Sequence, residues 1–171
     1  SARGLEPTTQ IYTILMTSYF DADPPDFAAA EALWTRLDRG NSGYGVALDT
    51  IFYDRMVEAY ARHHVHVGSA PMIKFLERMS REGKRPGWAV LELVARALVD
   101  REEWAVLYSL VDDIQHSKGM LRVGARGLVG QNEFWRYILG TGIMNRMGGK
   151  SEQELRKNVS SSSFHGLRDA I

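Results

Sequence analysis

The chain has 171 residues, of which 44% are hydrophobic and 25% are charged, a balance typical of one globular domain. Lys plus Arg and Asp plus Glu number 21 each, so the net charge is zero and the composition does not indicate a protein built to attract phosphate. There is no cysteine, which excludes disulfides and thiolate metal ligands, and no apolar run reaches the length of a membrane-spanning helix.

The first predicted helix begins near Thr9 and carries a regular apolar stripe. Its apolar residues are Tyr12, Leu15, Met16 and Tyr19. The spacing i, i+3, i+4, i+7 places such residues on one face of a helix. The same spacing returns twice along the chain, at Tyr53, Met56, Val57 and Tyr60, and at Leu91, Val94, Ala95 and Leu98. The sequence therefore predicts three equivalent helices.

A second helical stripe follows each of these helices after a turn. The stripes are Phe27, Ala30, Leu33, Trp34 and Leu37; Met72, Phe75, Leu76 and Met79; and Trp104, Leu107, Leu110, Val111 and Ile114. Asp26 is expected to cap the first of these second helices, and Pro71 to lie in the first turn of the next. The third turn, at 100–103, is the shortest. Each unit is therefore predicted to be a helix–turn–helix.

Two similar segments of the form Gly-x-x-Pro indicate where a unit ends. They lie at 4–7 and 83–86. Gly83 is expected to end a helix in the left-handed conformation, and Pro86 to prevent the helix from continuing. The units then span 9–49, 50–87 and 88–122. Residues 1–8 would be the tail of an upstream repeat, so we expect the chain to be a fragment of a longer array.

The regular pattern weakens beyond residue 122. A glycine-rich linker is predicted at 123–130, followed by a helix from Gln131 to Met147 with Phe134, Ile138 and Ile143 facing inward. We interpret 123–147 as a linker and a degenerate or capping helix, which covers the apolar face of the last repeat. The remainder, 148–171, is predicted to be a flexible C-terminal tail with a short helix around Glu152–Asn158.

These units resemble the pentatricopeptide repeat (PPR) family. The resemblance rests on Tyr12 and Tyr53 at the fourth position of a unit, on the stripe that ends at Met79, and on the segment 82–86. It covers residues 1–122 and implies an all-α fold, a right-handed α-solenoid of helix–turn–helix repeats whose first helices line the concave face. The related tetratricopeptide repeat is an alternative, although its Trp, Gly, Ala and Pro pattern is absent. A third alternative is another solenoid of helical hairpins that has no role in nucleic-acid binding.

The resemblance implies that single-stranded RNA lies along the first helices, one base per repeat. In this family the second, fifth and last positions of a unit contact the base. In this order, the residues are Gln10, Thr13 and Asp49 in the first unit, Ile51, Asp54 and Gly87 in the second, and Ala89, Glu92 and Arg122 in the third. Thr13 with Asp49 resembles the family's combination for guanine, whereas the other two pairs match no familiar combination.

Charges on the same helices bear on binding of the RNA backbone. The thirteenth positions, where the family often has a lysine, are Asp21, Arg62 and Asp100. Two carboxylates there oppose a phosphate backbone. The cations that would offset them are Arg55, Arg62 and Arg96. The candidate RNA-binding residues are Gln10, Thr13, Asp49, Ile51, Asp54, Arg55, Arg62, Glu92, Arg96 and Arg122.

The resemblance implies a non-catalytic module of an organellar RNA-metabolism protein, acting in mRNA processing, stability or translation. We expect a mitochondrial rather than a chloroplast location. The alternative is a protein–protein docking scaffold of an organellar assembly or translation factor, because solenoid faces also bind proteins and Asp54, Glu58 and Glu92 suit a basic partner.

Other motifs favour simpler interpretations. His63, His64 and His66 are expected in an exposed turn between helices rather than in a metal site, and no cofactor is predicted. The catalytic modules of some relatives need paired cysteines or clustered aspartates, and the tail beyond residue 147 contains only Asp169, so no enzymatic activity is expected. The tryptophans are expected to pack between helices. They are Trp34, Trp88, Trp104 and Trp135.

Overall fold

The computed structural model describes residues 9–40, 48–143 and 145. Within these ranges the chain is helical and has no strand, which confirms the predicted all-α class. The helices are α1 Thr9–Asp21, α2 Phe27–Gly40, α3 Thr50–Arg62, α4 His64–Val67, α5 Ala70–Arg81, α6 Trp88–Asp100, α7 Trp104–His116 and α8 Gln131–Gly140, with a short 3₁₀ turn η1 at Gly119–Leu121. The predicted tail of an upstream repeat, 1–8, and the predicted flexible tail, 148–171, lie outside the described residues.

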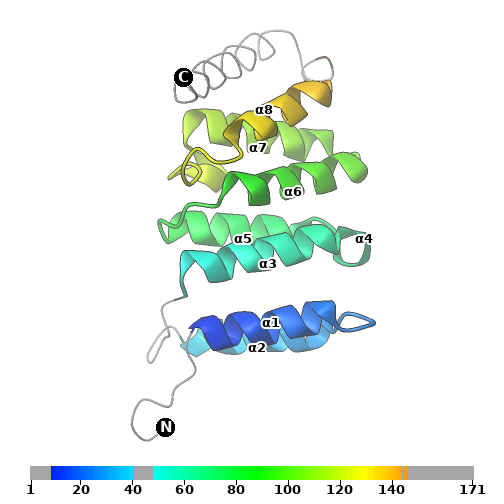
Figure 1. Ribbon diagram of the computed structural model, residues 1–171, viewed down its shortest axis with the longest axis vertical. Helices are drawn as coiled ribbons and strands as arrows, with labels where there is room; N and C mark the ends of the chain where they lie inside the picture. Colours follow the sequence, from blue (N-terminus) through cyan, green and yellow to red (C-terminus); the bar gives the residue numbers. More distant parts are fainter. Residues whose placement is uncertain (1–8, 41–47, 144, 146–171) are drawn as a thin grey trace, which may run out of the picture.

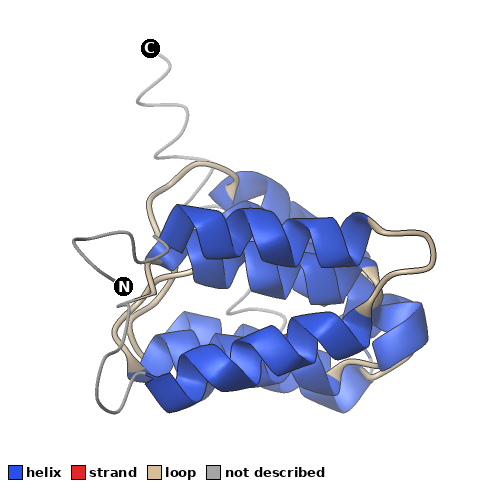
Figure 2. Ribbon diagram, turned by 90° about the horizontal axis from the view of Figure 1, so that it is seen from below, coloured by secondary structure: helices blue, strands red, loops and turns tan. Residues whose placement is uncertain are grey.

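The helices stack as antiparallel hairpins in two layers. The pairs α1 with α2, α3 with α5, and α6 with α7 form the hairpins, and α1, α3, α6 and α8 contact one another in that order (Figure 1). Figure 2 looks along the stack and shows the two layers. One layer contains α1, α3, α6 and α8, which we call the first layer, and the other contains α2, α5 and α7. The turn η1 packs against both α5 and α7.

Several predicted helix boundaries have the expected local cause. The Asp26 carboxylate accepts a hydrogen bond of 3.0 Å from the backbone N–H of Ala29 and so caps α2. Pro71 lies in the first turn of α5. After α5, Gly83 has a φ of +74°, the left-handed conformation that a glycine adopts without strain. The turn between α6 and α7 is three residues long, at 101–103.

The predicted apolar stripes form most of the core. All stripe residues of α3, α5 and α6 are buried, as are Leu107, Leu110, Val111 and Ile114 of α7. Their aromatic rings pack edge to face or stack across helices. Trp34 of α2 contacts Phe75 of α5 with ring centroids 4.5 Å apart, and Phe75 in turn stacks on Tyr60 of α3 at 5.5 Å. These contacts join the first two hairpins.

The stripe of α1 is only partly correct. Met16 is buried, but Leu15 is 37% exposed, and Phe20 takes its place in the core. The physical reason is the position of α1 at the end of the described stack (Figure 1), where its main contacts are with α2 and α3. Leu33 of α2 is half-buried for the same reason. A stripe predicts burial only where a neighbouring element covers it.

The end of the described chain differs from the prediction in two ways. The helix expected to reach Met147 ends as α8 at Gly140, and Gly142 has a φ of +69°, which an α-helix cannot include. The glycine-rich linker at 123–130 is attached to the helices. Its Gly127 carbonyl accepts a hydrogen bond of 2.8 Å from the Trp88 indole, and Trp88 is buried against Phe134 and Trp135 of α8. Phe134, Ile138 and Ile143 face inward as predicted.

The histidine segment also differs from the exposed turn predicted for it. Residues His64–Val67 form the short helix α4. His63 is partly buried, and its ring stacks on Phe20 and meets Phe27 edge to face, with centroids 6.1 and 5.7 Å apart. The segment therefore packs against the first hairpin.

Candidate functional site

Three equivalent rows of polar residues lie on the first layer. They are the fifth, ninth and thirteenth residues of α1, α3 and α6. The rows are Thr13, Thr17 and Asp21; Asp54, Glu58 and Arg62; and Glu92, Arg96 and Asp100. Residues four apart share one side of a helix, and the three helices run in the same direction (Figure 1). We call these nine residues the polar face.

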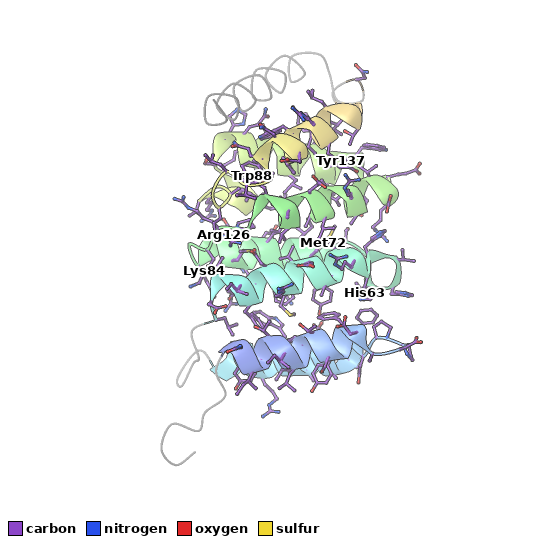
Figure 3. The ribbon with its side chains drawn as sticks, viewed as in Figure 1. His63, Met72, Lys84, Trp88, Arg126 and Tyr137 are labelled. Atoms are coloured by element: carbon purple, nitrogen blue, oxygen red, sulfur yellow. The ribbon has the colours of Figure 1, made fainter. Side chains whose placement is uncertain are left out.

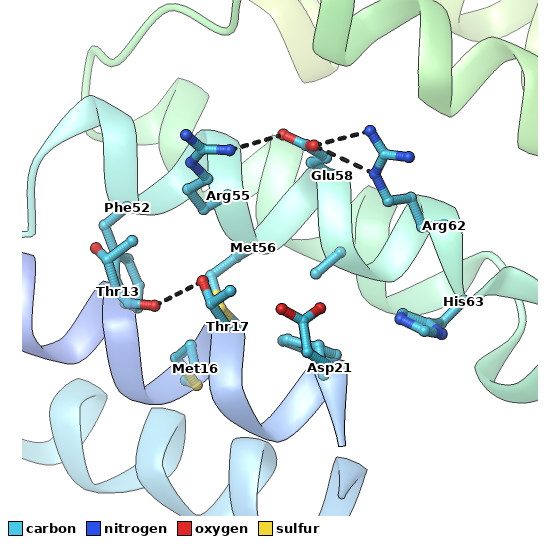
Figure 4. A pocket seen from close by; sticks show the side chains of 12 residues that line it. Thr13, Met16, Thr17, Asp21, Phe52, Arg55, Met56, Glu58, Arg62 and His63 are labelled. Atoms are coloured by element: carbon cyan, nitrogen blue, oxygen red, sulfur yellow. Dashed lines mark hydrogen bonds and ion pairs between the residues drawn. The ribbon is translucent and has the colours of Figure 1, made fainter. Parts of the chain in front are cut away.

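A cleft of about 230 Å³ opens between α1 and α3 along this face (Figure 4). Its floor is apolar and its rim is polar. The floor residues are Met16, Phe20, Phe52, Met56 and Ala59, and the rim residues are Thr13, Thr17, Asp21, Arg55, Glu58, Arg62 and His63. Small-molecule sites usually measure about 300–1,000 Å³, so this cleft suits one side chain or one base of a longer ligand.

The arginines of the polar face, and Arg55 beside it, are paired with carboxylates on their own helices. Glu58 accepts hydrogen bonds from Arg62, with Nη2 to Oε1 at 3.0 Å, and forms an ion pair with Arg55 at 3.6 Å (Figure 4). On α6, Arg96 Nε donates to Glu92 Oε2 at 3.1 Å. The arginine side chains are 54–60% exposed, so their remaining N–H groups face solvent. The nine residues of the polar face include five carboxylates and two guanidiniums, so the face is acidic and its attraction for a polyanion is weak.

The row on α3 begins with an ion pair between the buried carboxylate of Asp54 and a half-exposed arginine. Arg126, in the loop after η1, reaches Asp54, and its Nη2 lies 2.5 Å from Oδ2. Its Nη1 donates to the Arg85 carbonyl at 2.9 Å, and its backbone N–H to the Pro86 carbonyl at 2.8 Å. Burial raises the pKa of Asp54, although the Arg126 guanidinium and the Gly87 N–H oppose the shift. A Cβ on Gly87 would lie 3.1 Å from Arg126 Nη2, so this residue is packed closely against the pair.

The structure brings some of the predicted RNA-binding residues together and separates others. Thr13, Arg55 and Arg62 meet at the cleft, and Glu92 and Arg96 continue the polar face on α6. Gln10 and Ile51 are exposed at the starts of α1 and α3. Asp54 is paired with Arg126, whose guanidinium also lies close to Gly87.

Two predicted residues have a different place from the one expected. Arg122 lies with Glu77 and Arg81 of α5, in the second layer, and its backbone N–H donates to the Ser80 hydroxyl at 3.0 Å. The third unit ends at η1, which packs between α5 and α7 and so carries Arg122 away from the polar face. Asp49 is the N-cap of α3, and its carboxylate accepts the Phe52 N–H at 2.8 Å.

Replacing Asp49 with alanine should lower the free energy of unfolding by about 1 kcal/mol, because α3 loses its cap. Asp49→Ser keeps a capping oxygen and should cost only a few tenths of a kcal/mol, about the spread among good caps. Urea unfolding of both variants measures the difference. Equal stability of the two variants would show that the cap contributes nothing, and a loss of RNA binding by the serine variant would assign Asp49 a contact with the ligand.

Sequence reasoning missed two residues of this site, Arg126 and Tyr137. Arg126 lies 72 positions from Asp54 in a segment interpreted as a linker, so no local pattern connects them. Tyr137 of α8, which is labelled in Figure 3, lies beside Arg96, whose Cζ is 4.1 Å from the centre of the phenol ring. A signal for Arg126 was available in principle. An unpaired buried aspartate at the fifth position of a repeat requires a cation.

Within the described ranges, no group of three or more His, Asp or Glu side chains could hold a metal ion. In the same part of the chain, no helix has the length and apolarity needed to cross a bilayer.

No protein-family model, curated protein or solved structure matches this chain. The resemblance to pentatricopeptide repeats therefore rests on the residues quoted from the sequence.

Proposed function

We propose that this chain is a non-catalytic helical-repeat module that binds single-stranded RNA along the polar face. In this proposal the hairpins α1–α2, α3–α5 and α6–α7 are successive repeats of a right-handed α-solenoid, and α8 covers the last of them. A mitochondrial protein of mRNA processing, stability or translation is the setting that the resemblance implies.

The observation that carries the proposal is the repetition of the polar face. Three parallel helices present polar residues at the same positions, and neighbouring helices pack about 8–10 Å apart. A ligand with one recognition group per helix fits such a surface, and helical-repeat proteins read single-stranded RNA at one base per repeat. The α1–α3 cleft adds a site for one base, with an apolar floor under Thr13 and Thr17.

The test is binding of this chain to a randomised single-stranded RNA pool at low and moderate salt. We expect the double variant Arg55→Gln/Arg62→Gln to bind the RNA about tenfold more weakly. It should also reduce the slope of log K against log salt by about 1.4, because each phosphate contact with a single strand contributes about 0.7 to that slope. The matched control is Arg36→Gln/Arg81→Gln, which removes the same charge from exposed positions of α2 and α5. Equal effects of both pairs would place the RNA elsewhere, and no binding at low salt would reject the proposal.

A protein-docking role is the second candidate, and two observations favour it. The polar face carries five carboxylates and two guanidiniums, and α1 exposes Ile11, Ile14 and Leu15. An acidic face beside an apolar patch suits a basic protein partner. The protein-docking role would be favoured if the chain bound RNA weakly and Thr13→Ala left that binding unchanged.

A further inference from the structure

Arg96 and Tyr137 form a pair at the boundary between α6 and α8. The Arg96 guanidinium carbon lies over the Tyr137 ring, 4.1 Å from its centre. Such a short distance is typical of a cation–π contact. Tyr137 is half-buried, and the two residues come from helices that pack against each other. The guanidinium therefore has a fixed aromatic support on one side.

A second contact limits the rotation of Arg96. Its Nε donates to Glu92 Oε2 at 3.1 Å, one helical turn away. The third member of the same row, Asp100, acts on Tyr137 together with Glu92 and Arg96. Burial is the main cause that raises the pKa of the Tyr137 hydroxyl, Arg96 opposes the shift, and the two carboxylates add to it. Each member of the α6 row thus acts electrostatically on the same phenol, and Arg96 also contacts its ring.

Arg96 keeps more than half of its side-chain surface accessible to a ligand. Its side chain is 54% exposed, although it is held by both Glu92 and Tyr137. A guanidinium is planar, delocalised and weakly hydrated, so a second flat group can stack on its other side. Nucleobases stack on arginine planes as well as on aromatic rings in single-stranded RNA complexes.

We propose that Arg96, supported by Tyr137, is a stacking platform for one nucleobase of a single-stranded RNA. This inference rests on the proposed RNA-binding function and names a contact within it. The platform lies where the polar face ends, because the fifth and ninth residues of α8 are the buried Trp135 and the half-buried Leu139. A strand that follows the first layer from α1 therefore reaches the platform last. Stacking needs no particular base, so the platform supports binding without selecting a sequence.

Three variants test the platform. Tyr137→Leu removes the ring and keeps the charge, Arg96→Lys keeps the charge and removes the plane, and Tyr137→Phe keeps the ring and removes only the hydroxyl. We expect the first two to weaken binding of a short single-stranded RNA about tenfold, without a change in the salt slope, because no phosphate contact is lost. Tyr137→Phe should bind within about twofold of the unchanged protein.

A fluorescent adenine analogue in the RNA supplies a direct readout. Its emission should fall on binding to the unchanged protein and to Tyr137→Phe, and fall less with Arg96→Lys, whose exposed substitution leaves the core intact. Unchanged affinity and quenching in Arg96→Lys and Tyr137→Leu would overturn the platform and leave the proposed function standing. Failure of the unchanged protein to bind RNA at low salt would overturn both and favour protein docking.

Discussion

Leu107→Ala should lower the free energy of unfolding by about 2–5 kcal/mol. Leu107 lies in α7 and is fully buried, so the substitution removes apolar contacts and leaves a cavity in a core shared by neighbouring helices. The measurement is urea or thermal unfolding followed by circular dichroism. For a domain of this size, such a change lowers Tm by several degrees.

Leu33→Ala is the matched control. Both leucines belong to the predicted stripes of second helices, but Leu33 is half-buried in the end hairpin. Its loss should cost about 1–2 kcal/mol, since less surface returns to water and solvent can fill the space. Equal losses for the two variants would contradict the placement of α1 and α2 at the end of the stack.

Arg126→Ala should produce the second large effect, a loss of about 1–3 kcal/mol. The substitution leaves the Asp54 carboxylate, whose side chain is only 11% exposed, without its cation. Breaking a fully buried pair costs about 3–5 kcal/mol, but the Arg126 side chain is 48% exposed, so water can partly replace it. A double-mutant cycle with Asp54→Asn isolates the interaction, and we expect the double variant to be more stable than the sum of the single losses predicts.

The effect of Arg126→Ala should also depend on pH. The pKa of Asp54 is raised in the folded protein, so its contribution to stability is fully present below the pKa of the unfolded chain and is lost as pH rises through the folded pKa. Arg126 holds that pKa down, and its removal should raise it further. The stability difference between Arg126→Ala and the unchanged protein should therefore be small near about pH 4 and larger at neutral pH. Equal differences at both pH values would show that Asp54 is not the group left unpaired.

Most of the fold could be predicted from the sequence because its signals are local. The helix starts near Thr9, Thr50 and Trp88 follow from apolar periodicity, and the stop at Gly83 follows from the conformational freedom of glycine. The prediction was wrong about Met147 as a helix end. The apolar residues after Gly140 suggest that the helix continues, but Gly142 has a left-handed backbone conformation, which ends it.

The candidate site could be predicted only in part. The rows of polar residues follow from helical spacing, so Thr13, Arg62 and Arg96 could be assigned to one side of their helices. Arg122 could not be placed, because its position depends on how η1 packs against α5 and α7. The pairing of Asp54 could not be predicted either, because its partner Arg126 lies in the loop that follows η1.

The sequence by itself determined the all-α class, the succession of helices and most of the residues of α3, α5, α6 and α7 that face the core. Hydrogen bonding and side-chain spacing within a helix involve residues at most a few positions apart. Only the tertiary structure decided which distant residues meet. It brought Arg126 to Asp54 and Arg96 to Tyr137, and it left Leu15 exposed on the end helix. These outcomes depend on which helix lies beside which, and local spacing carries no information about a neighbour 40 or 70 residues away.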